Sequence, residues 1–402
     1  MPSKIPIGPY HPLQEEPEHF VLTVEGERVI DIDVSIGYNH RGIEKLAESK
    51  TYDQTVFLVE RICGICSTSH PLAFCLAVED CAGLEVPERA NYIRTIIDEF
   101  QRLHSHLLWL GLAGHFMGYN TVWMWAWKYR EPLLELLEVL TGNRQHYGMM
   151  RVGGVRRDIP PEYYPLIRKV LEGLKPKLKM LYDAVRDDPV IQARLAGVGR
   201  LSPEDALRYG VLGPTARASG IEIDIRRDYP YGASDKVEWR VITSERGDML
   251  ARVEVRLLEC LESIKMIEGC LERMSGREGE GPISSDVPRR LPPGEGIGQV
   301  EAPRGECFHY VVANGTDKPE RLKIRAPTYM NLPSFRATCI GETVSDVVLI
   351  LAGIDPCYCC TERSIKIKDG RKETTLCWED LLKLSWEKTA RLRKELGDDG
   401  LG

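Results

Sequence analysis

Two Cys-x-x-Cys pairs near opposite ends of the chain constrain its fold more than any other feature. Cys63 and Cys66 form the first pair and Cys357 and Cys360 the second, so that 357 − 63 = 294 positions separate their first members. Two intervening residues let both thiolates of a pair bind one metal ion, and four thiolates make a complete set of soft ligands. If the pairs share a metal centre, the fold must bring the two ends of the chain together.

Spacing alone leaves three kinds of site open: a structural zinc site, a redox or catalytic metal site, and a dithiol switch. Zinc ribbons usually hold their cysteine pairs close in sequence, whereas this chain of 402 residues is long enough to fold without a metal. A thioredoxin-like switch is disfavoured because a helical pattern, not a strand and turn, precedes Cys63. The residues around the cysteines must therefore decide.

The composition is that of a folded globular protein and excludes several classes of function. Apolar residues make up 43% and charged residues 28% of the chain, which excludes a disordered or low-complexity polymer. Lys and Arg total 53 against 60 for Asp and Glu, so the net charge of 53 − 60 = −7 predicts no nucleic-acid partner. The first residues lack the apolar segment of a secretory signal, so we expect a reducing compartment, in which paired cysteines indicate metal or redox chemistry.

Hydrophobic periodicity predicts mainly helices with smaller β segments. Residues 19–36 alternate apolar and polar around Gly26, which predicts two strands and a tight turn. Residues 93–107 have the i, i+3, i+4 spacing of a helix with one buried face. The uncharged residues 107–127 contain three glycines, so we expect a helix, a break and a second helix rather than a membrane span. Further helices are predicted at 131–141, 164–186, 248–274 and 343–352, strands at 307–313 and 321–325, and a Gly- and Pro-rich loop at 276–303.

The flanks of the cysteine pairs resemble a known family. Residues 60–70 read ERICGICSTSH and residues 355–363 read DPCYCCTER. Both segments resemble the large subunit of [NiFe] hydrogenases, whose motifs are RxCGxCxxxH near the N-terminus and DPCxxCxx(H/R) near the C-terminus. Agreement of two distant motifs in order, spacing and flanks is a specific signal, and it favours a catalytic metal over structural zinc.

Further segments extend the resemblance from about residue 8 to residue 363. RGIE at 41–44, APRG at 302–305 and APT at 326–328 match elements of the family. GPYHP at 8–12 and EEPE at 15–18 resemble the energy-converting, membrane-bound branch, which is similar to the 49 kDa quinone-site subunit of respiratory complex I. The complex I relatives have lost the four cysteines, whereas this chain keeps them.

The resemblance implies an α+β, mainly α fold, in which a central bundle of long helices carries smaller β-rich portions. We divide the chain accordingly into a β-rich segment at 1–50, a helical catalytic core at 51–363 and a tail at 364–402. Within the core we expect β insertions at about 195–240 and 276–340.

The resemblance also implies a centre of nickel and of iron that carries CO and CN⁻ ligands. Cys66 and Cys360 would bridge the two metals, while Cys63 and Cys357 would bind nickel alone. Polarisable thiolates suit both metals. Because side chains cannot supply CO or CN⁻, maturation proteins would make and insert these ligands.

Other residues take roles by the same similarity. Splitting H₂ releases a proton that needs a base within about 3 Å, and a terminal thiolate such as Cys357 would be close enough. Glu16 would relay the proton, although without the resemblance the acidic residues 15–18 are expected to form a solvated loop. Arg304 would bond a cyanide nitrogen and hold positive charge over the open coordination position, with a surface arginine as the alternative.

Three more assignments complete the site. Thr328 lies in the segment whose hydroxyl bonds a cyanide ligand in the family, and His70 would hydrogen-bond in the region of the first motif's sulfurs. Glu44 would bind a third metal, magnesium or iron, with helix capping or an ion pair as alternatives. Arg363 stands where many relatives have a histidine for that third metal, which puts the third site in doubt. The remaining cysteines, Cys307 among them, are expected to be small buried hydrophobes.

The sequence therefore predicts the catalytic large subunit of an energy-converting [NiFe] hydrogenase, peripheral on the cytoplasmic face of the membrane and without a membrane span of its own. The implied partners are a small subunit with a [4Fe-4S] cluster, a ferredoxin-like iron–sulfur subunit, integral-membrane subunits, ferredoxin as electron donor, and an endopeptidase that removes the tail after Arg363. A permanent, docked tail is the alternative to cleavage. Two rival functions stay open: a complex I-like or sulfur-reducing subunit, and a scaffold with a structural Cys₄ zinc site.

Overall fold

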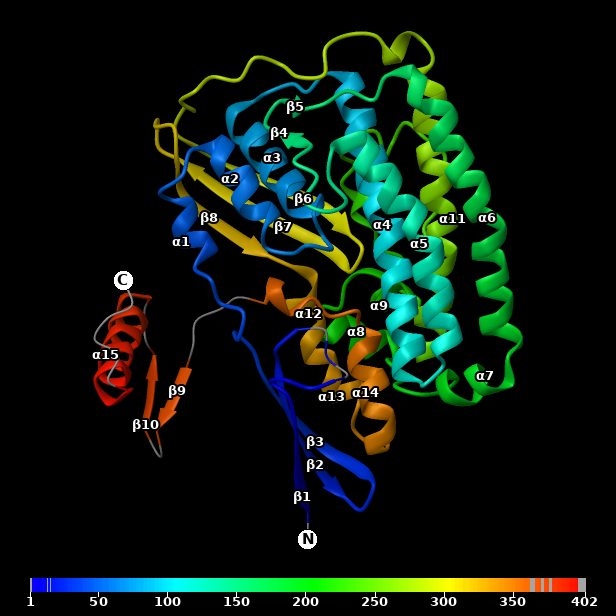
Figure 1. The fold of residues 1–402 in the computed structure, drawn as a ribbon, viewed down its shortest axis with the longest axis vertical. Helices are drawn as coiled ribbons and strands as arrows, with labels where there is room; N and C mark the ends of the chain where they lie inside the picture. Colours follow the sequence, from blue (N-terminus) through cyan, green and yellow to red (C-terminus); the bar gives the residue numbers. More distant parts are fainter. Residues whose placement is uncertain are drawn as a thin grey trace.

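Helix α4 (Glu88–Phe116) is the centre of the fold, which the computed structural model describes for residues 2–12, 14, 16–361, 366–369, 372–375 and 378–396. Its apolar face, which includes Ile93, Ile97 and Phe100, is fully buried. Two long helices, α5 (Asn120–Thr141) and α11 (Met249–Met274), pack against it, and α6 (Tyr164–Asp187) packs against both of these to complete a bundle (Figure 1). The helices that periodicity predicted in these regions are confirmed.

The uncharged stretch at 107–127 is divided between two helices, as expected. Helix α4 ends at Phe116 and α5 begins at Asn120, with Gly118 in a left-handed conformation between them. Among the described residues, no helix combines the length and the apolar character that crossing a membrane requires.

A three-stranded antiparallel sheet lies beside the bundle in the order β6-β7-β8, and helix α3 (Ser69–Ala82) packs across β6 and β7 (Figure 1). Its strands are β6 (Gly294–Ala302), β7 (Gly305–Ala313) and β8 (Pro319–Arg325). The predicted strands at 307–313 and 321–325 are confirmed, but the loop predicted at 276–303 is wrong for β6.

Close packing on α3 explains why β6 contains so many glycines. A Cβ at Gly296 would lie 2.0 Å from the carbonyl oxygen of Ala77, and one at Gly298 would lie 1.9 Å from that of Ala73. Only glycine lets the strand backbone approach the helix backbone this closely. The composition that indicated a loop therefore reflects a helix lying on a strand.

A second antiparallel sheet, β1-β2-β3, forms its own small core at the N-terminal end of the chain. It consists of β1 (Ser3–Ile7), β2 (His19–Glu25) and β3 (Arg28–Ser35), so the predicted hairpin at 19–36 is confirmed. The sheet packs on α13 (Phe335–Thr338) and α14 (Val344–Gly353), where the rings of Phe20 and Phe335 lie 5.7 Å apart. This contact brings residues 16–18 beside the second cysteine motif.

The expected β insertion at about 195–240 is wrong, because the described residues there form short helices and loops. Ser202 and Asp224 cap α8 and α10 through their side chains, and prolines lie in the first turns of α8 and α9. The turn-forming residues in this region are thus helix starts. The helices are α8 (Pro203–Arg208), α9 (Gly213–Arg217) and α10 (Ile225–Asp228).

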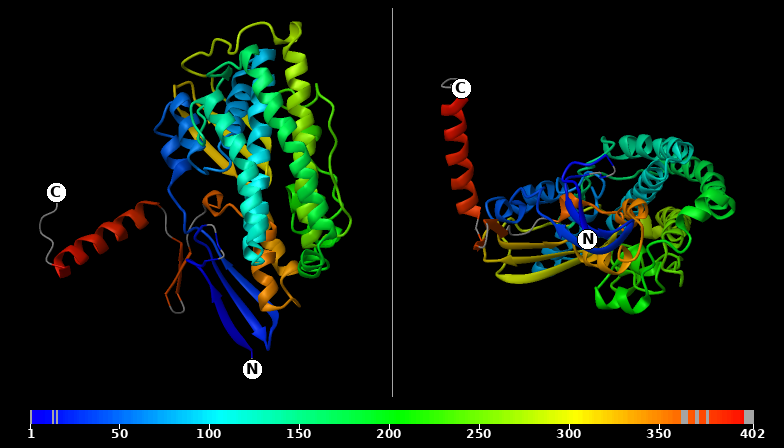
Figure 2. Two further views of the ribbon diagram at one scale, coloured as in Figure 1. Left: turned by 45° about the vertical axis from the view of Figure 1, so that its right-hand side comes forward. Right: turned by 90° about the horizontal axis from the view of Figure 1, so that it is seen from below.

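Short elements complete the described chain. They are α1 (Ile43–Ala47), α2 (Tyr52–Glu60), β4 (Met150–Arg151), β5 (Gly154–Val155), α7 (Pro189–Leu195), α12 (Pro327–Asn331), β9 (Lys366–Asp369), β10 (Lys372–Thr375) and α15 (Trp378–Leu396). Both views of Figure 2 show α15 standing away from the body of the molecule. The side chains of α15 that are described are mostly exposed.

Candidate metal centre

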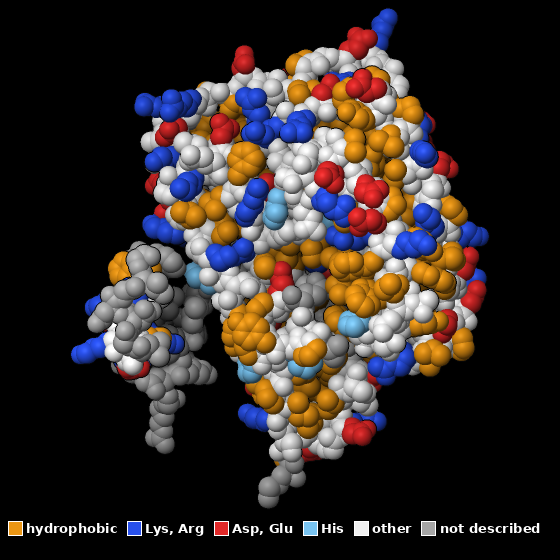
Figure 3. Space-filling view, in the orientation of Figure 1, with side chains coloured by type: hydrophobic (Ala, Val, Ile, Leu, Met, Phe, Trp, Pro, Cys, Tyr) orange, Lys and Arg blue, Asp and Glu red, His pale blue; other side chains and the backbone are white. Residues whose placement is uncertain are grey.

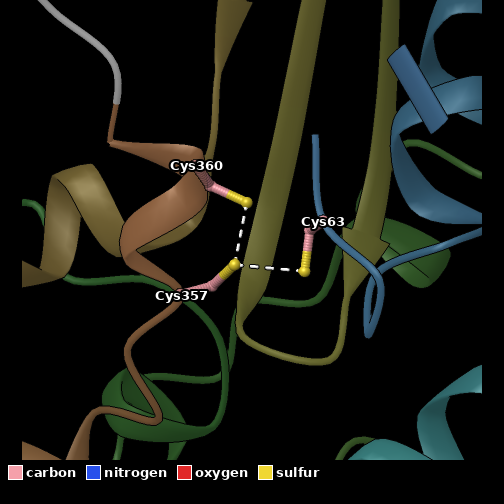
Figure 4. A group of neighbouring side chains, drawn as sticks. All are labelled: Cys63, Cys357 and Cys360. Carbon is pink, nitrogen blue, oxygen red and sulfur yellow. Dashed lines mark hydrogen bonds between the residues drawn. The ribbon is translucent and has the colours of Figure 1, made fainter. Parts of the chain in front are cut away.

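The two cysteine pairs meet between the bundle and the sheet. The Sγ atom of Cys357 lies 3.1 Å from that of Cys63 and 3.0 Å from that of Cys360 (Figure 4). The thiol of Cys66 also interacts with Cys63 and Cys357, and all four cysteines are buried. Two segments that are far apart in the sequence thus present their sulfurs to one point.

The first pair sits in an irregular segment between two helices, and the second spans a single 3-10 turn, Tyr358–Cys360. Cys63 and Cys66 lie between α2 and α3, and the Cys66 amide donates a hydrogen bond to the Cys63 sulfur over 3.2 Å. Cys357 and Cys360 follow α14, from which the chain turns at Asp355 with a φ of 55°. Aspartate adopts this left-handed conformation more readily than most residues. Such loops let both thiols of a pair point the same way.

Hydrogen bonds among the four thiols distribute their acidity unevenly. Donation from Cys357, Cys360 and Cys66 lowers the pKa of Cys63 well below its usual value. The pKa values of the other three thiols are raised, since they act as donors around one favoured thiolate and burial disfavours further charge. Thiols must lose their protons to bind a metal, so a nearby positive charge assists the binding.

Arg304 supplies that positive charge from the turn between β6 and β7. It is buried, with Nη1 3.5 Å from the Cys66 sulfur and 3.3 Å from Ser105 Oγ. Its Nε donates to the carbonyl oxygen of Asp355 over 2.6 Å, and its Nη2 lies 2.7 Å from the Asp355 carboxylate. The surface role that the sequence left open for Arg304 is therefore wrong.

The backbone of Arg304 is held by residues that the sequence did not single out. The Asn331 side chain donates to the Arg304 carbonyl oxygen over 3.4 Å and accepts from the Leu212 amide over 2.8 Å. Gly213 has a φ of 66°, and a Cβ there would lie 2.4 Å from the same carbonyl oxygen. This close contact with α9 fixes the turn that aims the guanidinium.

Thr328 and His70 both contact the second cysteine motif. Thr328 Oγ1, on α12, accepts from the Cys357 amide over 3.0 Å, which leaves its hydroxyl hydrogen able to donate elsewhere. His70 Nε2, at the start of α3, lies 3.4 Å from the Cys360 sulfur. We expected His70 to hydrogen-bond in the region of the first motif's sulfurs; the sulfur that it contacts there is Cys360 of the second motif, which lies within 4.8 Å of Cys63 Sγ.

The other side of the His70 ring faces two residues of β7. His70 Nδ1 lies 3.1 Å from His309 Nε2 and 3.4 Å from Cys307 Sγ, and all three residues are buried. Cys307 thus has a polar contact with His70 in addition to its packing in the core. Positions 307 and 309 share one face of a strand, and this spacing is the signal in the sequence that could have revealed the group.

Glu16 lies against the second motif rather than in a solvated loop. Its carboxylate accepts from the Cys359 amide over 2.6 Å and from the Cys359 thiol over 2.7 Å. Burial and the neighbouring Cys63 raise the pKa of Glu16. On its other side Glu16 lines a cavity of about 390 Å³ together with residues of the 9–17 segment.

Glu18 is also buried, in contrast to the solvated acidic loop that the sequence suggested in isolation. It accepts a hydrogen bond from Thr361 Oγ1 over 3.3 Å, and burial raises its pKa to about 8.

The face of the molecule in Figure 3 is hollowed near its centre, and hydrophobic side chains gather around and below the hollow.

Glu44 has protein partners instead of a free carboxylate. Lys323 donates to it over 2.7 Å and the Ile324 amide over 2.9 Å, so α1 is tied to β8. The geometry thus favours the ion pair that the sequence left open as an alternative to a third metal. Arg363 lies outside the described residues.

A buried ionic network supports the turn that carries Arg304. Arg217 bonds Glu301 over 2.7 Å and Glu259 over 2.7 Å, and the Ile225 amide donates to the other oxygen of Glu301. The network contains five carboxyl groups and three guanidinium groups, all buried: Asp98, Glu99, Asp224, Glu259, Glu301, Arg102, Arg217 and Arg226. Burial, which the arginines oppose only in part, raises the pKa of Asp98 and of Glu301 to about 7 each.

The donor set fits a thiophilic metal centre. Four buried thiols offer soft ligands, and the buried guanidinium of Arg304 lies at their edge, where it also pairs with the Asp355 carboxylate.

Comparison with known families agrees with this geometry. The sequence model described as "Respiratory-chain NADH dehydrogenase, 49 Kd subunit" matches residues 117–290 and 284–363, and that described as "Nickel-dependent hydrogenase" matches residues 41–112. The first match spans much of the bundle and the second cysteine motif, and the second match spans the first motif.

Individual relatives match over nearly the whole chain. The "Membrane-bound hydrogenase subunit alpha" of Pyrococcus furiosus is 42% identical and covers 98% of this chain and 95% of its own length. The "Carbon monoxide-induced hydrogenase" of Rhodospirillum rubrum is 39% identical over 89% of this chain and 99% of its own. A subunit of the NADH-quinone oxidoreductase of Clostridium beijerinckii is 39% identical over 87% of this chain and 94% of its own.

A solved structure shares the fold. It is titled as that of the membrane-bound sulfane sulfur reductase, an archaeal respiratory membrane complex, and one of its chains superposes with a TM-score of 0.85 at 33% identity, covering 90% of this chain and 98% of that one. The predicted fold class, mainly helical with smaller sheets, is confirmed. The chain belongs to the family that unites the large subunits of nickel-dependent hydrogenases with the 49 kDa subunit of respiratory complex I.

Proposed function

We propose that this chain is the catalytic large subunit of a membrane-bound, energy-converting [NiFe] hydrogenase, which interconverts H₂ with two protons and two electrons. The observation that carries the proposal is the burial of all four motif cysteines around one point beside Arg304. The hydrogenase names of the Pyrococcus and Rhodospirillum relatives support it.

Cys63, Cys66, Cys357 and Cys360 would hold nickel and iron, with Cys66 and Cys360 bridging and with CO and CN⁻ on the iron. When bound, the bimetallic centre supplies the place at which H₂ is split and its electrons are collected. Arg304 would direct positive charge at an anionic cyanide, and the hydroxyl hydrogen of Thr328 would donate to another.

The proton would leave through side chains of this chain. A terminal thiolate, Cys357 Sγ, is the nearest base, and Glu16 is the relay because it touches Cys359 and also lines a cavity. A carboxyl group whose pKa is raised by burial can hold a proton at neutral pH and pass it on. These two contacts support the proposal that Glu16 would move protons between the cysteine cluster and the cavity.

The electrons would leave through partner subunits. Among the described residues, no second set of four cysteines could hold an iron–sulfur cluster. We therefore propose a small subunit with a [4Fe-4S] cluster near the nickel, a ferredoxin-like iron–sulfur subunit, and integral-membrane subunits that couple the reaction to ion transport. Ferredoxin is the proposed external donor, and the complex would lie on the cytoplasmic face of the membrane.

Metal analysis and infrared spectroscopy of the mature protein test the proposal. Nickel and iron in equal amounts, with CO and CN⁻ stretching bands and exchange of H₂ with deuterated water, are the expected results. Zinc alone would indicate a structural Cys₄ scaffold and refute the hydrogenase.

A sulfur-reducing function is the second candidate, because the superposed structure belongs to a sulfane sulfur reductase complex. The two functions differ in their substrate. A complex that reduces sulfane sulfur and shows no isotope exchange with H₂ would favour this candidate over the hydrogenase.

Maturation by an endopeptidase is part of the proposal. Cleavage between Arg363 and Ser364, at positions outside the described residues, would release the tail that contains α15. Intact-mass measurement of the mature chain decides between removal of the tail and its retention as a docking element.

A further inference from the structure

Three buried side chains form a hydrogen-bonded row behind the second cysteine motif. His309, on β7, approaches His70 with an Nε2 to Nδ1 distance of 3.1 Å, and His70 Nε2 lies 3.4 Å from the Cys360 sulfur. The Nδ1 atom of His309, at the far end of the row, is buried and has no hydrogen-bond partner in the described part of the chain.

The missing partner of His309 Nδ1 determines where the protons of the row must lie. If His70 Nδ1 donated to His309 Nε2, the proton of His309 would have to sit on Nδ1. A buried N–H without an acceptor is among the costliest and rarest features of protein interiors, whereas a bare ring nitrogen costs less. A protonated, charged His309 would leave the same orphaned N–H.

The remaining arrangement gives each contact a donor and an acceptor. His309 Nε2–H donates to His70 Nδ1, and His70 Nε2–H is then left to donate to Cys360 Sγ. This direction is also the one that a metal-bound Cys360 requires, because a thiolate can only accept. The Cys307 thiol, 3.4 Å from His70 Nδ1, is at most a weaker second donor to the same nitrogen.

We infer that His309 is a positioning residue: by donating to His70 Nδ1 it fixes the His70 tautomer and so secures the hydrogen bond from His70 to the Cys360 sulfur. The effect on a metal centre rests on the proposed function, whereas the hydrogen-bonded row itself does not. A hydrogen bond to a bridging thiolate withdraws charge from the metals, so His309 would tune the electron density of the iron from a distance.

The first test needs no metal. Nitrogen-15 NMR of the full chain labelled at histidine should show His70 and His309 both protonated on Nε2, with the two residues assigned through their substitution. A proton on His309 Nδ1, or on His70 Nδ1, would overturn the inference whatever reaction the protein catalyses.

Substitutions test the consequence at the metal centre. His309→Phe keeps a ring but has no donor, whereas the amide nitrogen of His309→Gln can take the place of Nε2. In metal-loaded protein, His309→Phe should shift the infrared CO band to lower wavenumber, and His309→Gln should restore it. Val311→Ala is the matched control: Val311 is buried on the same face of β7, and this variant should leave the band near its wild-type position.

Several results would contradict the inference. An unchanged CO band in loaded His309→Phe would show that the row does not reach the metals, and equal shifts in the Phe and Gln variants would indicate a packing effect. If the purified protein held a zinc ion that Cys307→Ala removed, His70, Cys307 and His309 would be ligands of that ion and would not form the hydrogen-bonded row. Absence of CO bands in the wild type would refute the proposed function, and the NMR result would still decide the direction of the row.

Discussion

Replacing Glu301 by glutamine should change how the stability of the protein depends on pH. Glu301 is buried in the ionic network behind Arg304, and burial, opposed by Arg217 and reinforced by Asp224, raises its pKa from 4.5 to about 7. The folded state therefore holds a proton on this group at pH values at which the unfolded chain has lost it.

The sign and size of the effect follow from linkage. Stability from a raised carboxyl pKa is fully present below pH 4.5 and is lost as the pH rises through about 7. At about 1.4 kcal/mol for each tenfold change in proton affinity, the rise to about 7 corresponds to roughly 3 kcal/mol. Glutamine resembles the protonated carboxyl and does not ionise, so Glu301→Gln should escape this loss.

Urea unfolding of the full chain near pH 4.5 and near pH 8 measures the effect. The free energy of unfolding of Glu301→Gln relative to wild type should be about 3 kcal/mol more favourable at the higher pH than at the lower. Glu138→Gln, on an exposed position of α5, is the control. If Glu301→Gln and wild type differed in free energy of unfolding by the same amount at both pH values, the reasoning that burial raises the pKa of Glu301 would be refuted.

Three further predictions concern the metal centre. Cys66→Ala should lose nickel and iron in elemental analysis. Cys75→Ala, which is equally buried but lies outside both pairs, is the control and should keep both metals. Metal retained in Cys66→Ala would contradict the ligand assignment. Glu16→Gln should keep the metals but slow H/D exchange, and normal exchange would remove Glu16 from the proton path. Arg304→Met leaves the Asp355 carboxylate buried without its counter-charge and should lower the free energy of unfolding by about 3–5 kcal/mol. Adding Asp355→Asn should recover part of that loss in urea titrations, and no recovery would argue against a pairing effect.

Local patterns were sufficient to predict the long helices of the bundle and the cysteine motifs. The buried face of α4 repeats with helical periodicity at Ile93, Ile97 and Phe100, and such periodicity is a property of the sequence alone. The spacing and flanks of the two cysteine pairs likewise indicated one soft-ligand site, because ligand geometry requires that spacing within each pair. The fold class followed from the same patterns and the family resemblance.

Other features depend on which distant segments lie side by side. The glycines of β6 resembled a loop until α3 was found against them, and Glu16 and Glu18 resembled a solvated loop until the N-terminal sheet carried them to the second motif. His309 acquires a role only because β7 faces His70 on α3.

The difference between the features that the sequence predicted and those that depend on the fold has a physical cause. Periodicity and ligand spacing are set by the geometry of consecutive residues, so the order of the amino acids determined the long helices and the paired thiols by itself. Burial, charge balance and proton position depend on groups brought together through space. Only the folded chain could therefore decide that the pKa of Glu301 is raised, that Glu44 is paired with Lys323, and that His70 turns toward Cys360.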